Sequence, residues 1–264
     1  MTLTIKQVID RLRSSVQPIG DTVDVLAPGD PEAEVRGIAT TFMATHQVIE
    51  QAVSMGVNLL ISHEAPFYSH RMTEGLLTGD PVYGRKEQSL RESGIAIYRH
   101  HDYCHRLEPD IIMTGLLQRL KWESDVEEML PTAAVLRLPE RRLADIAAYV
   151  KEKLSIPYAR IAGDPEMLCS RIGILVGYRG GGANAIPLYR EKGLDLVICG
   201  EGPEWETPEY VRDSAWQGVS KSLIVIGHAE SEEPGMRSLA HRLQEEYPEV
   251  PVHFIPVNPV FRVI

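Results

Sequence analysis

The chain has 264 residues, of which 44% are apolar and 24% are charged, as expected for a folded protein with one large domain or two smaller ones. The formal net charge of −10 argues against a nucleic-acid partner, because affinity for phosphates comes mainly from clustered lysine and arginine. Three cysteines without C-x-x-C spacing argue against a disulfide framework or a zinc knuckle, and the lack of a signal-type or membrane-length apolar run predicts a soluble, cytoplasmic protein with no membrane partner.

Hydrophobic periodicity predicts β-rich apolar runs that alternate with amphipathic helices, which is typical of an α/β protein. In the first half we expect helices at residues 5–16, 46–55, 86–93 and 109–120, and strands at residues 37–42, 57–62 and 95–99. After residue 125 we expect helices at residues 141–154, 185–192 and 234–246, and strands at residues 171–178, 194–199, 222–227 and 251–256.

Two segments of the chain resemble each other. Residues 35–64 and 170–201 both run strand, turn, helix, glycine and strand, and both end on a glutamate, Glu64 or Glu201. A further strand that reaches a histidine follows in each half. We interpret this pattern as an internal duplication, although two unrelated β-α-β units could also look alike. It predicts a first half at residues 1–125, completed by residues 250–264, and a second half at residues 126–249, with residues 123–138 as the connection.

Side chains of the kind that bind metals follow four of the predicted strands. They are His63 and Glu64; His100, His101 and His105; Glu201, with Glu204 and Glu206 close behind; and His228 and Glu232. Ligands gather beyond the carboxyl ends of parallel strands, so these residues are candidates for one site. The pairs His101/His105 and His228/Glu232 are both spaced i, i+4, which places each pair on one face of a helical turn. A single such residue is more often solvated or capping, but the clustering of histidines at strand ends favours a metal site.

Three other features carry weaker signals. The run from Arg179 to Gly182 joins a strand to a helix and could bind an anion through its amides, although a plain tight turn is the favoured interpretation. Cys104 lies inside the histidine cluster, where a packing role is favoured over a chemical one. The sequence contains no nucleophile elbow and no convincing Cys-His-Asn arrangement.

The segments GIATTFMATHQVIEQAVSMGVNLLISHEAPFY, IAIYRHHDYCH, DLVICGE and VIGHAESEEPG resemble the dinuclear-metal-centre hexameric family, which is NGG-interacting-factor-like and GTP cyclohydrolase I type 2-like. The resemblance covers nearly the whole chain. It implies two interlinked three-layer α/β/α halves, a metal site in the cleft between them, two metal ions and a homo-hexamer. Carried over by position, the metal ligands are His63, Glu64, His105, His228 and Glu232.

The sequence departs from the family pattern at two of these ligands. Glu64 stands where the family commonly has His, and His105 stands where it has Asp. The two exchanges compensate, because the set still holds three histidines and two carboxylates, which favours a retained site.

The resemblance and the ligand set together predict a metal-dependent hydrolase that acts on a nucleotide or another small substrate. Mixed imidazole and carboxylate ligands suit Zn, Mn, Fe, Co or Ni. In this prediction His101 or Glu201 is the general base or orients a ligand. The alternative is a metal-binding regulatory or scaffold hexamer, without catalytic activity, that binds a protein partner.

Overall fold

The structure is a computed structural model that describes residues 2–71, 75 and 77–264. It contains two compact units. Unit 1 comprises Met1–Ile111 and Met236–Arg262, and unit 2 comprises Ile112–Gly235 and Val263–Ile264. Two helices cross the boundary, namely α5 (Ile111–Leu120) and α9 (His228–Glu246).

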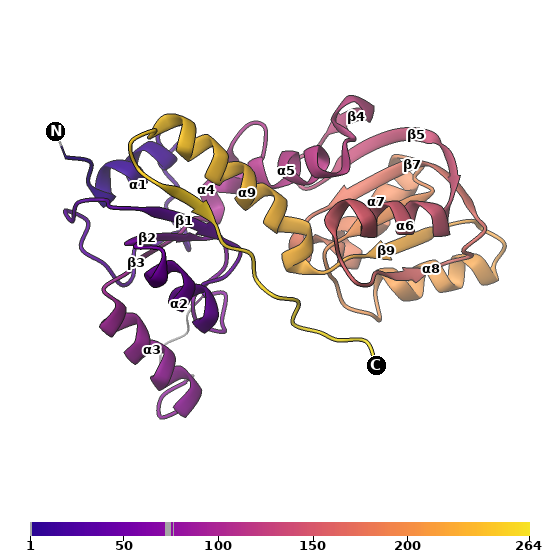
Figure 1. Ribbon diagram of the computed structural model, residues 1–264. Coiled ribbons are helices and arrows are strands. Elements are labelled where there is room, and N and C mark those ends of the chain that lie inside the picture. The colour runs from indigo at the N-terminus through magenta and orange to yellow at the C-terminus, as the bar shows by residue number, and fades with distance from the viewer. Residues whose placement is uncertain (1, 72–74, 76) are drawn as a thin grey trace. The chain divides into compact units, whose positions relative to one another are not determined.

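Unit 1 is built on a small parallel sheet (Figure 1). Its remaining elements are α1 (Ile5–Arg13), β1 (Ile38–Thr41), α2 (His46–Ser54), β2 (Leu59–Ser62), α3 (Pro81–Ser93), β3 (Ala96–Arg99), α4 (Asp102–Arg106) and β10 (Val252–Phe254). The strand order is β10-β1-β2-β3, and every pairing is parallel. Strand β10, from residues 252–254, therefore forms the edge of this sheet next to β1.

The four-residue strands of unit 1 are buried on both faces, which explains why they are continuous apolar runs rather than alternating ones. One face packs on α2 and α3 in a core that includes Ala39, Leu60, Ile97 and Leu90. Figure 1 shows α1 and α9 along the other face. The side chains of Thr4 and Thr45 cap the first turns of α1 and α2, so these helices begin where the sequence offers a hydroxyl.

Unit 2 is built on a larger mixed sheet. Its further elements are η1 (Glu123–Asp125), β4 (Val126–Met129), β5 (Ala134–Arg142), α6 (Leu143–Leu154), β6 (Arg160–Ala162), β7 (Leu168–Leu175), η2 (Gly177–Gly180), α7 (Gly182–Glu191), β8 (Leu196–Cys199), α8 (Thr207–Trp216) and β9 (Ser222–Val225). The order is β4-β5-β7-β8-β9-β6, in which β7, β8 and β9 are parallel and the outer pairings are antiparallel. Helices α7 and α8 pack on one face of this sheet through residues such as Leu188 and Val211.

The strands expected from the sequence are all present, but unit 2 contains more sheet than the sequence predicted. Residues 123–138, expected to be a connection, form η1, β4 and the first part of β5. The sequence also missed β6 and α8, whereas α4 was expected only as a helical turn that carries His101 and His105. Helix α9 begins at His228, six residues before the predicted start, and continues through Pro234.

The two units share a connectivity, since β1-α2-β2 and β7-α7-β8 are both parallel β-α-β units followed by a further parallel strand. This topology agrees with the repeated pattern in the sequence. Duplication as its origin stays a prediction.

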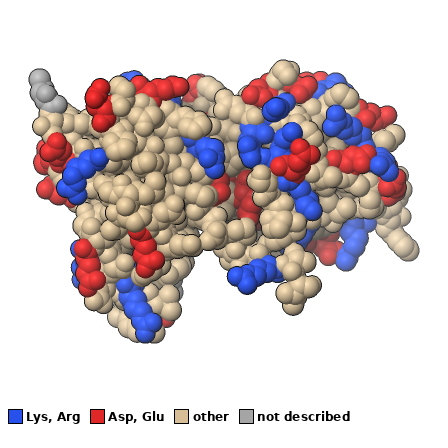
Figure 2. All heavy atoms as spheres, viewed as in Figure 1, with Lys and Arg blue, Asp and Glu red and all other residues tan. Residues whose placement is uncertain are grey.

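The surface carries charges of both signs. Acidic and basic side chains are interspersed over the face shown in Figure 2. Exposed pairs include Arg142 with Asp145 and Glu166. Among the helices of the described residues, none combines the length and the apolar character needed to cross a bilayer.

Candidate functional site

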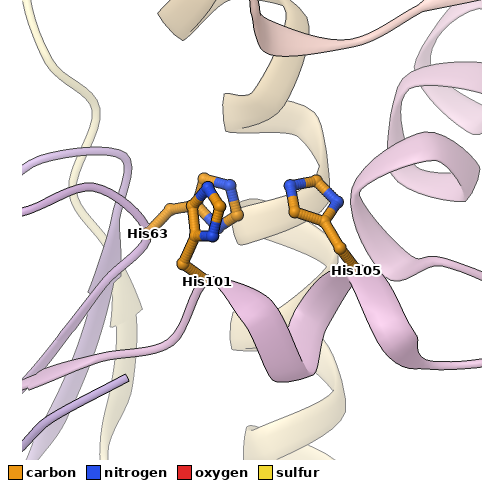
Figure 3. A group of neighbouring side chains, drawn as sticks. All are labelled: His63, His101 and His105. Atoms are coloured by element: carbon orange, nitrogen blue, oxygen red, sulfur yellow. The ribbon is translucent and has the colours of Figure 1, made fainter. Parts of the chain in front are cut away.

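Three histidines of unit 1 lie together beyond the carboxyl ends of β2 and β3 (Figure 3). Ser62 and Arg99 pair as the last residues of these strands, so the residues that follow them emerge side by side. His63 follows β2, whereas His101 is the N-cap residue of α4 and His105 lies one turn later. Ring centroids are 4.7 Å apart for His63 and His101, 5.0 Å for His63 and His105, and 5.1 Å for His101 and His105.

Each ring in this histidine cluster is held by its Nδ1 atom. Nδ1 of His63 lies 3.1 Å from the carbonyl oxygen of His100. Nδ1 of His101 lies 2.9 Å from Oδ1 of Asp102, and Nδ1 of His105 lies 2.9 Å from Oδ2 of Asp110. Carbonyl and carboxylate oxygens only accept hydrogen bonds, so Nδ1 carries the proton in all three rings. In the neutral imidazole the lone pair is then on Nε2.

The histidine cluster fits a transition-metal ion. Its possible ligand atoms, one from each ring, lie within 4.8 Å of one another. An imidazole that donates from Nδ1 to a carboxylate or carbonyl and presents Nε2 is the usual form of a metal-binding histidine. Three such ligands would leave room for a further group on a four-coordinate ion.

The environment of His101 keeps its ring neutral at pH 7. Burial, together with repulsion from His63 and His105, lowers the pKa of His101 to about 4, against the opposing effects of Glu64 and Asp102. A neutral ring is the form that binds a metal ion.

Asp24 fixes the start of α4, the short helix that carries His101 and His105. Its carboxylate accepts the backbone N–H groups of His101, Asp102 and Tyr103 at 2.9, 2.7 and 3.2 Å. Burial favours a higher pKa for Asp24, but His100, whose Nδ1 lies 3.6 Å from Oδ2, and the hydrogen bonds from the amides of Asp102 and His101 outweigh it and bring the pKa to about 2. The carboxylate therefore stays ionised and caps the helix.

Glu64 lies beside the histidine cluster and is paired with a buried guanidinium. Its Oε2 accepts a hydrogen bond from Arg99 at 2.9 Å, and its Oε1 lies 3.6 Å from Nε2 of His101. The Arg99 side chain is only 2% exposed, and burial lowers its pKa against the influence of Glu64. One oxygen of Glu64 thus faces Arg99, and the other faces the histidine cluster.

Unit 2 has a cluster of its own, formed by Glu201, His228 and Glu232. Nδ1 of His228 lies 2.9 Å from Oε1 of Glu201, and Nε2 lies 3.2 Å from Oε2 of Glu232. The hydrogen bond with His228 lowers the pKa of Glu201. A Cβ at Gly177 would lie 2.1 Å from Glu232 Oε1, so only glycine allows the loop after β7 to approach so closely.

The i, i+4 pairs His101/His105 and His228/Glu232 both lie on helical turns in the structure. His228 and Glu232 occupy the first turns of α9, and the His105 amide donates to the His101 carbonyl at 3.2 Å. The structure therefore brings His63, Glu64, His101 and His105 together in unit 1. In unit 2 it brings together Glu201, His228 and Glu232.

The weaker sequence features have structural roles. The Gly182 amide, a candidate anion donor, donates to Glu206 Oε2 at 2.6 Å, so this position at the start of α7 is occupied by the chain itself. Glu204 is exposed and pairs with Arg160 at 2.7 Å. Cys104 is fully buried, in agreement with a packing role.

Sequence reasoning missed the residues that orient the ligands. Asp102 and Asp110 lie one and five residues beyond the histidines they contact, a local signal that was available. Asp24 precedes its amide partners by 77 to 79 residues, and Arg99 belongs to an apolar strand, so neither could be assigned without the fold.

Comparison with known proteins finds one matching family and several relatives with a common description. The chain matches the family described as Duf34/NIF3 (NGG1p interacting factor 3) over residues 6–260. It is 26% identical over 228 residues to a GTP cyclohydrolase 1 type 2 homolog of Clostridium perfringens, covering 83% of this chain and 82% of the relative. It is 27% identical over 221 residues to a protein of the same description from Deinococcus radiodurans, covering 81% and 78%.

A solved structure shares the fold. The crystal structure of a Bacillus cereus protein related to NIF3 superposes with a TM-score of 0.78 at 15% identity and covers 100% of both chains. That likeness concerns the fold, and the match over residues 6–260 shows the family: the chain belongs to Duf34/NIF3 (NGG1p interacting factor 3).

Proposed function

We propose that this protein is a metal-dependent hydrolase that acts on a nucleotide or another small substrate. The observation that carries the proposal is the histidine cluster. Three imidazoles offer ligand atoms within 4.8 Å of one another, while an acceptor oxygen lies next to each Nδ1. This arrangement of three neighbouring rings is the usual one for histidines that bind a metal ion.

The proposal assigns His63, His101 and His105 as ligands of one divalent ion, with Glu64 beside them. His101, which the sequence suggested as a base or an orienting residue, is better suited as a ligand because its Nδ1 is already engaged by Asp102. His228 and Glu232 supply ligands for a second ion. Glu201 orients His228 through its contact with Nδ1.

A transition-metal ion held by these residues would supply a water of lowered pKa and a Lewis acid for a substrate oxygen. The protein's own part is to orient the three rings, which Asp102, Asp110 and the His100 carbonyl do. The mixed nitrogen and oxygen donors suit Zn, Mn, Fe, Co or Ni. The description of the curated relatives as GTP cyclohydrolase 1 type 2 homologs supports a nucleotide as the first substrate class to test.

The first experiment is elemental analysis of protein purified without chelator. We expect about two transition-metal ions per chain, because the two clusters offer more ligands than one four-coordinate ion uses. His105→Ala should reduce the metal content, whereas the control His46→Ala, which changes an exposed residue of α2, should not. Wild-type protein that holds no metal after reconstitution would overturn the proposal.

The second experiment distinguishes an enzyme from a scaffold. Metal-loaded protein is assayed for turnover on nucleotides, phosphoesters and cyclic amides, with His105→Ala as the negative control. We expect turnover that requires the metal. Fully loaded protein that is inert on every panel would favour the regulatory or scaffold alternative.

A further inference from the structure

Ser231 is a fully buried serine that lies in the chain between the two candidate metal ligands of unit 2. It belongs to the start of α9, three residues after His228 and one residue before Glu232, and it is 0% exposed. A serine inside a helix commonly donates to a carbonyl of the preceding turn. A contact beyond the helix is therefore what distinguishes a positioning role from local packing.

The Ser231 hydroxyl makes two hydrogen bonds, and one of them leaves the helix. Oγ donates to the carbonyl oxygen of His228 at 2.7 Å, within the first turn of α9. It also accepts a hydrogen bond from the backbone N–H of Gly177 at 2.8 Å. Gly177 is buried and begins η2, the short segment that follows β7. One hydroxyl thus joins the helix that carries both ligands to the loop after β7.

The backbone of Gly177 lies directly against both ligands. A Cβ on this residue would lie 2.1 Å from Oε1 of Glu232 and 3.0 Å from Nε2 of His228. Its φ of +59° is in the left-handed region, which glycine adopts without strain. The position of the Gly177 backbone therefore sets the space beside the ligand atoms of His228 and Glu232.

Both polar groups of Gly177 are bonded to residues of this cluster. Its N–H donates to Ser231, and its carbonyl oxygen accepts the N–H of Glu201 at 2.9 Å. Glu201 in turn holds Nδ1 of His228. A Cβ at Gly200 would lie 2.6 Å from the Ser231 Oγ and 2.6 Å from the Gly177 carbonyl oxygen, so the three segments meet with no room for a larger residue.

We propose that Ser231 is a positioning residue for the metal ligands of unit 2. Its hydroxyl holds the Gly177 backbone against His228 and Glu232, and this contact fixes the arrangement in which the two side chains receive an ion. The inference rests on the proposed function, since it takes an ion at these ligands as given. Groups that orient metal ligands without contacting the ion raise the affinity for the metal. In Ser231→Ala a buried N–H loses its acceptor, which is unfavourable, so the Gly177 backbone would shift.

The alternative is that Ser231 stabilises the fold and has no effect on the ligands, and Ser214 provides the matched control. Ser214 is 6% exposed and also lies on a helix of unit 2, α8. Its hydroxyl donates to the carbonyl oxygen of Val211, three residues earlier, at 2.8 Å. Ser214→Ala therefore removes the same kind of local bond, whereas Ser231→Ala also removes the bond to Gly177.

The experiment is a competitive titration of zinc against a chelator, with urea denaturation of each chelator-treated variant as the measure of stability. Glu232→Ala identifies the zinc ion that belongs to unit 2, because this substitution removes one of its ligands. Ser231→Ala should weaken the binding of that ion about tenfold and leave the other ion unaffected. Ser214→Ala should leave the affinities for both ions unchanged.

A second variant tests the same contact from the loop. Gly177→Ala places a methyl group where Glu232 and His228 now lie, so it should weaken the binding of the same zinc ion and leave the other unaffected. Unchanged zinc binding by Gly177→Ala would mean that the Gly177 backbone does not govern the ligands, and the role of Ser231 would be refuted.

The remaining outcomes separate this inference from the proposed function. Ser231→Ala with the zinc affinities of wild type would overturn the role of Ser231 and leave the metal site standing. Equal losses of zinc affinity in Ser231→Ala and Ser214→Ala would also overturn it, because they would follow from lowered stability alone. Wild type that binds no zinc ion sensitive to Glu232→Ala would overturn the second ion of the proposed function, and the inference about Ser231 with it.

Discussion

At the scale of single residues, the pair formed by Arg99 and Glu64 should be important for stability. The Arg99 side chain is 2% exposed and that of Glu64 is 18% exposed. Removing one partner of a buried pair leaves the other charge uncompensated. Glu64→Gln should therefore lower the free energy of unfolding by about 3 kcal/mol, measured by urea denaturation in the presence of chelator.

An exposed pair of the same composition is the control for this prediction. Arg91 and Glu87 form an i, i+4 pair on α3 with side chains 68% and 41% exposed. Glu87→Gln should change the free energy of unfolding by less than about 0.5 kcal/mol. Equal effects of the two substitutions would show that burial of Arg99 does not depend on Glu64.

Asp110 gives a second prediction at the residue scale. Its Oδ2 lies 2.9 Å from Nδ1 of His105 and sets the orientation and tautomer of that ring. A carboxylate that accepts a hydrogen bond from a metal-binding histidine raises the affinity for the metal without contacting the ion. Asp110→Ala should weaken zinc binding about tenfold to a hundredfold in a competitive chelator titration, whereas Asp80→Ala, far along the chain in the cap of α3, should leave the zinc affinity unchanged.

At the scale of elements, α4 depends on a cap that the sequence does not supply locally. His101, the N-cap residue, makes no side-chain cap hydrogen bond, and Asp24 accepts the first amides instead. Asp24→Ala should lower the free energy of unfolding by about 3 kcal/mol, because it removes a buried acceptor of three amides. Asp80→Ala removes an exposed cap from α3 and should lower it by about 1 kcal/mol. A loss for Asp24→Ala no larger than that for Asp80→Ala would contradict the capping role.

Helix α3 carries a buried lysine that should make stability depend on pH. Burial lowers the pKa of Lys86 from 10.5 to about 8, although its amine donates to the Pro66 carbonyl and lies over the Phe67 and Tyr68 rings. Between these pH values the unfolded chain holds one more proton than the folded chain. Stability therefore rises with pH across this window.

Comparison with Lys86→Met isolates this contribution, since other titrating groups are common to both proteins. From pH 8 to pH 10.5 the stability of wild type should rise relative to Lys86→Met by up to about 3 kcal/mol. Denaturant titrations at several pH values measure the difference. A difference that does not vary with pH would mean that Lys86 has an ordinary pKa.

Most of the strands that the sequence predicted are buried on both faces, whereas the strands that it missed are partly exposed. Strands such as β2 and β8 are uninterrupted apolar runs between helices, so their pattern is unambiguous. By contrast, β4 alternates half-buried and exposed residues, and β5 ends in Pro-Glu-Arg-Arg, which reads as a loop. These two strands form through pairing with each other and with β7, a contact that local patterns do not encode.

At the scale of the whole molecule, the sequence likewise predicted only part of the candidate site. His63, Glu64, His101 and His105 could be grouped from sequence, because parallel strands deliver their last residues to one edge. Asp24 caps the helix that carries His101, and Arg99 pairs with Glu64. Both contacts join residues that are far apart in the sequence. Only the fold brings them to the ligands.

The last prediction concerns assembly, where the sequence resemblance implies a hexamer and the structure offers a surface to test. The C-terminal tail, residues 258–264, exposes Val260, Phe261 and Val263 at 82%, 73% and 74%. Contiguous exposed apolar side chains are typical of interfaces, so we expect this tail to be buried between copies of the chain. Light scattering should give a mass about six times the 29.5 kDa of one chain, and the double variant Phe261→Ser/Val263→Ser should give a smaller species. Val82→Ser, which changes a 62% exposed residue of α3, should leave the mass unchanged. A stable 29.5 kDa wild type at micromolar concentration would refute the assembly, whereas a double variant of undiminished mass would refute only the role of the tail.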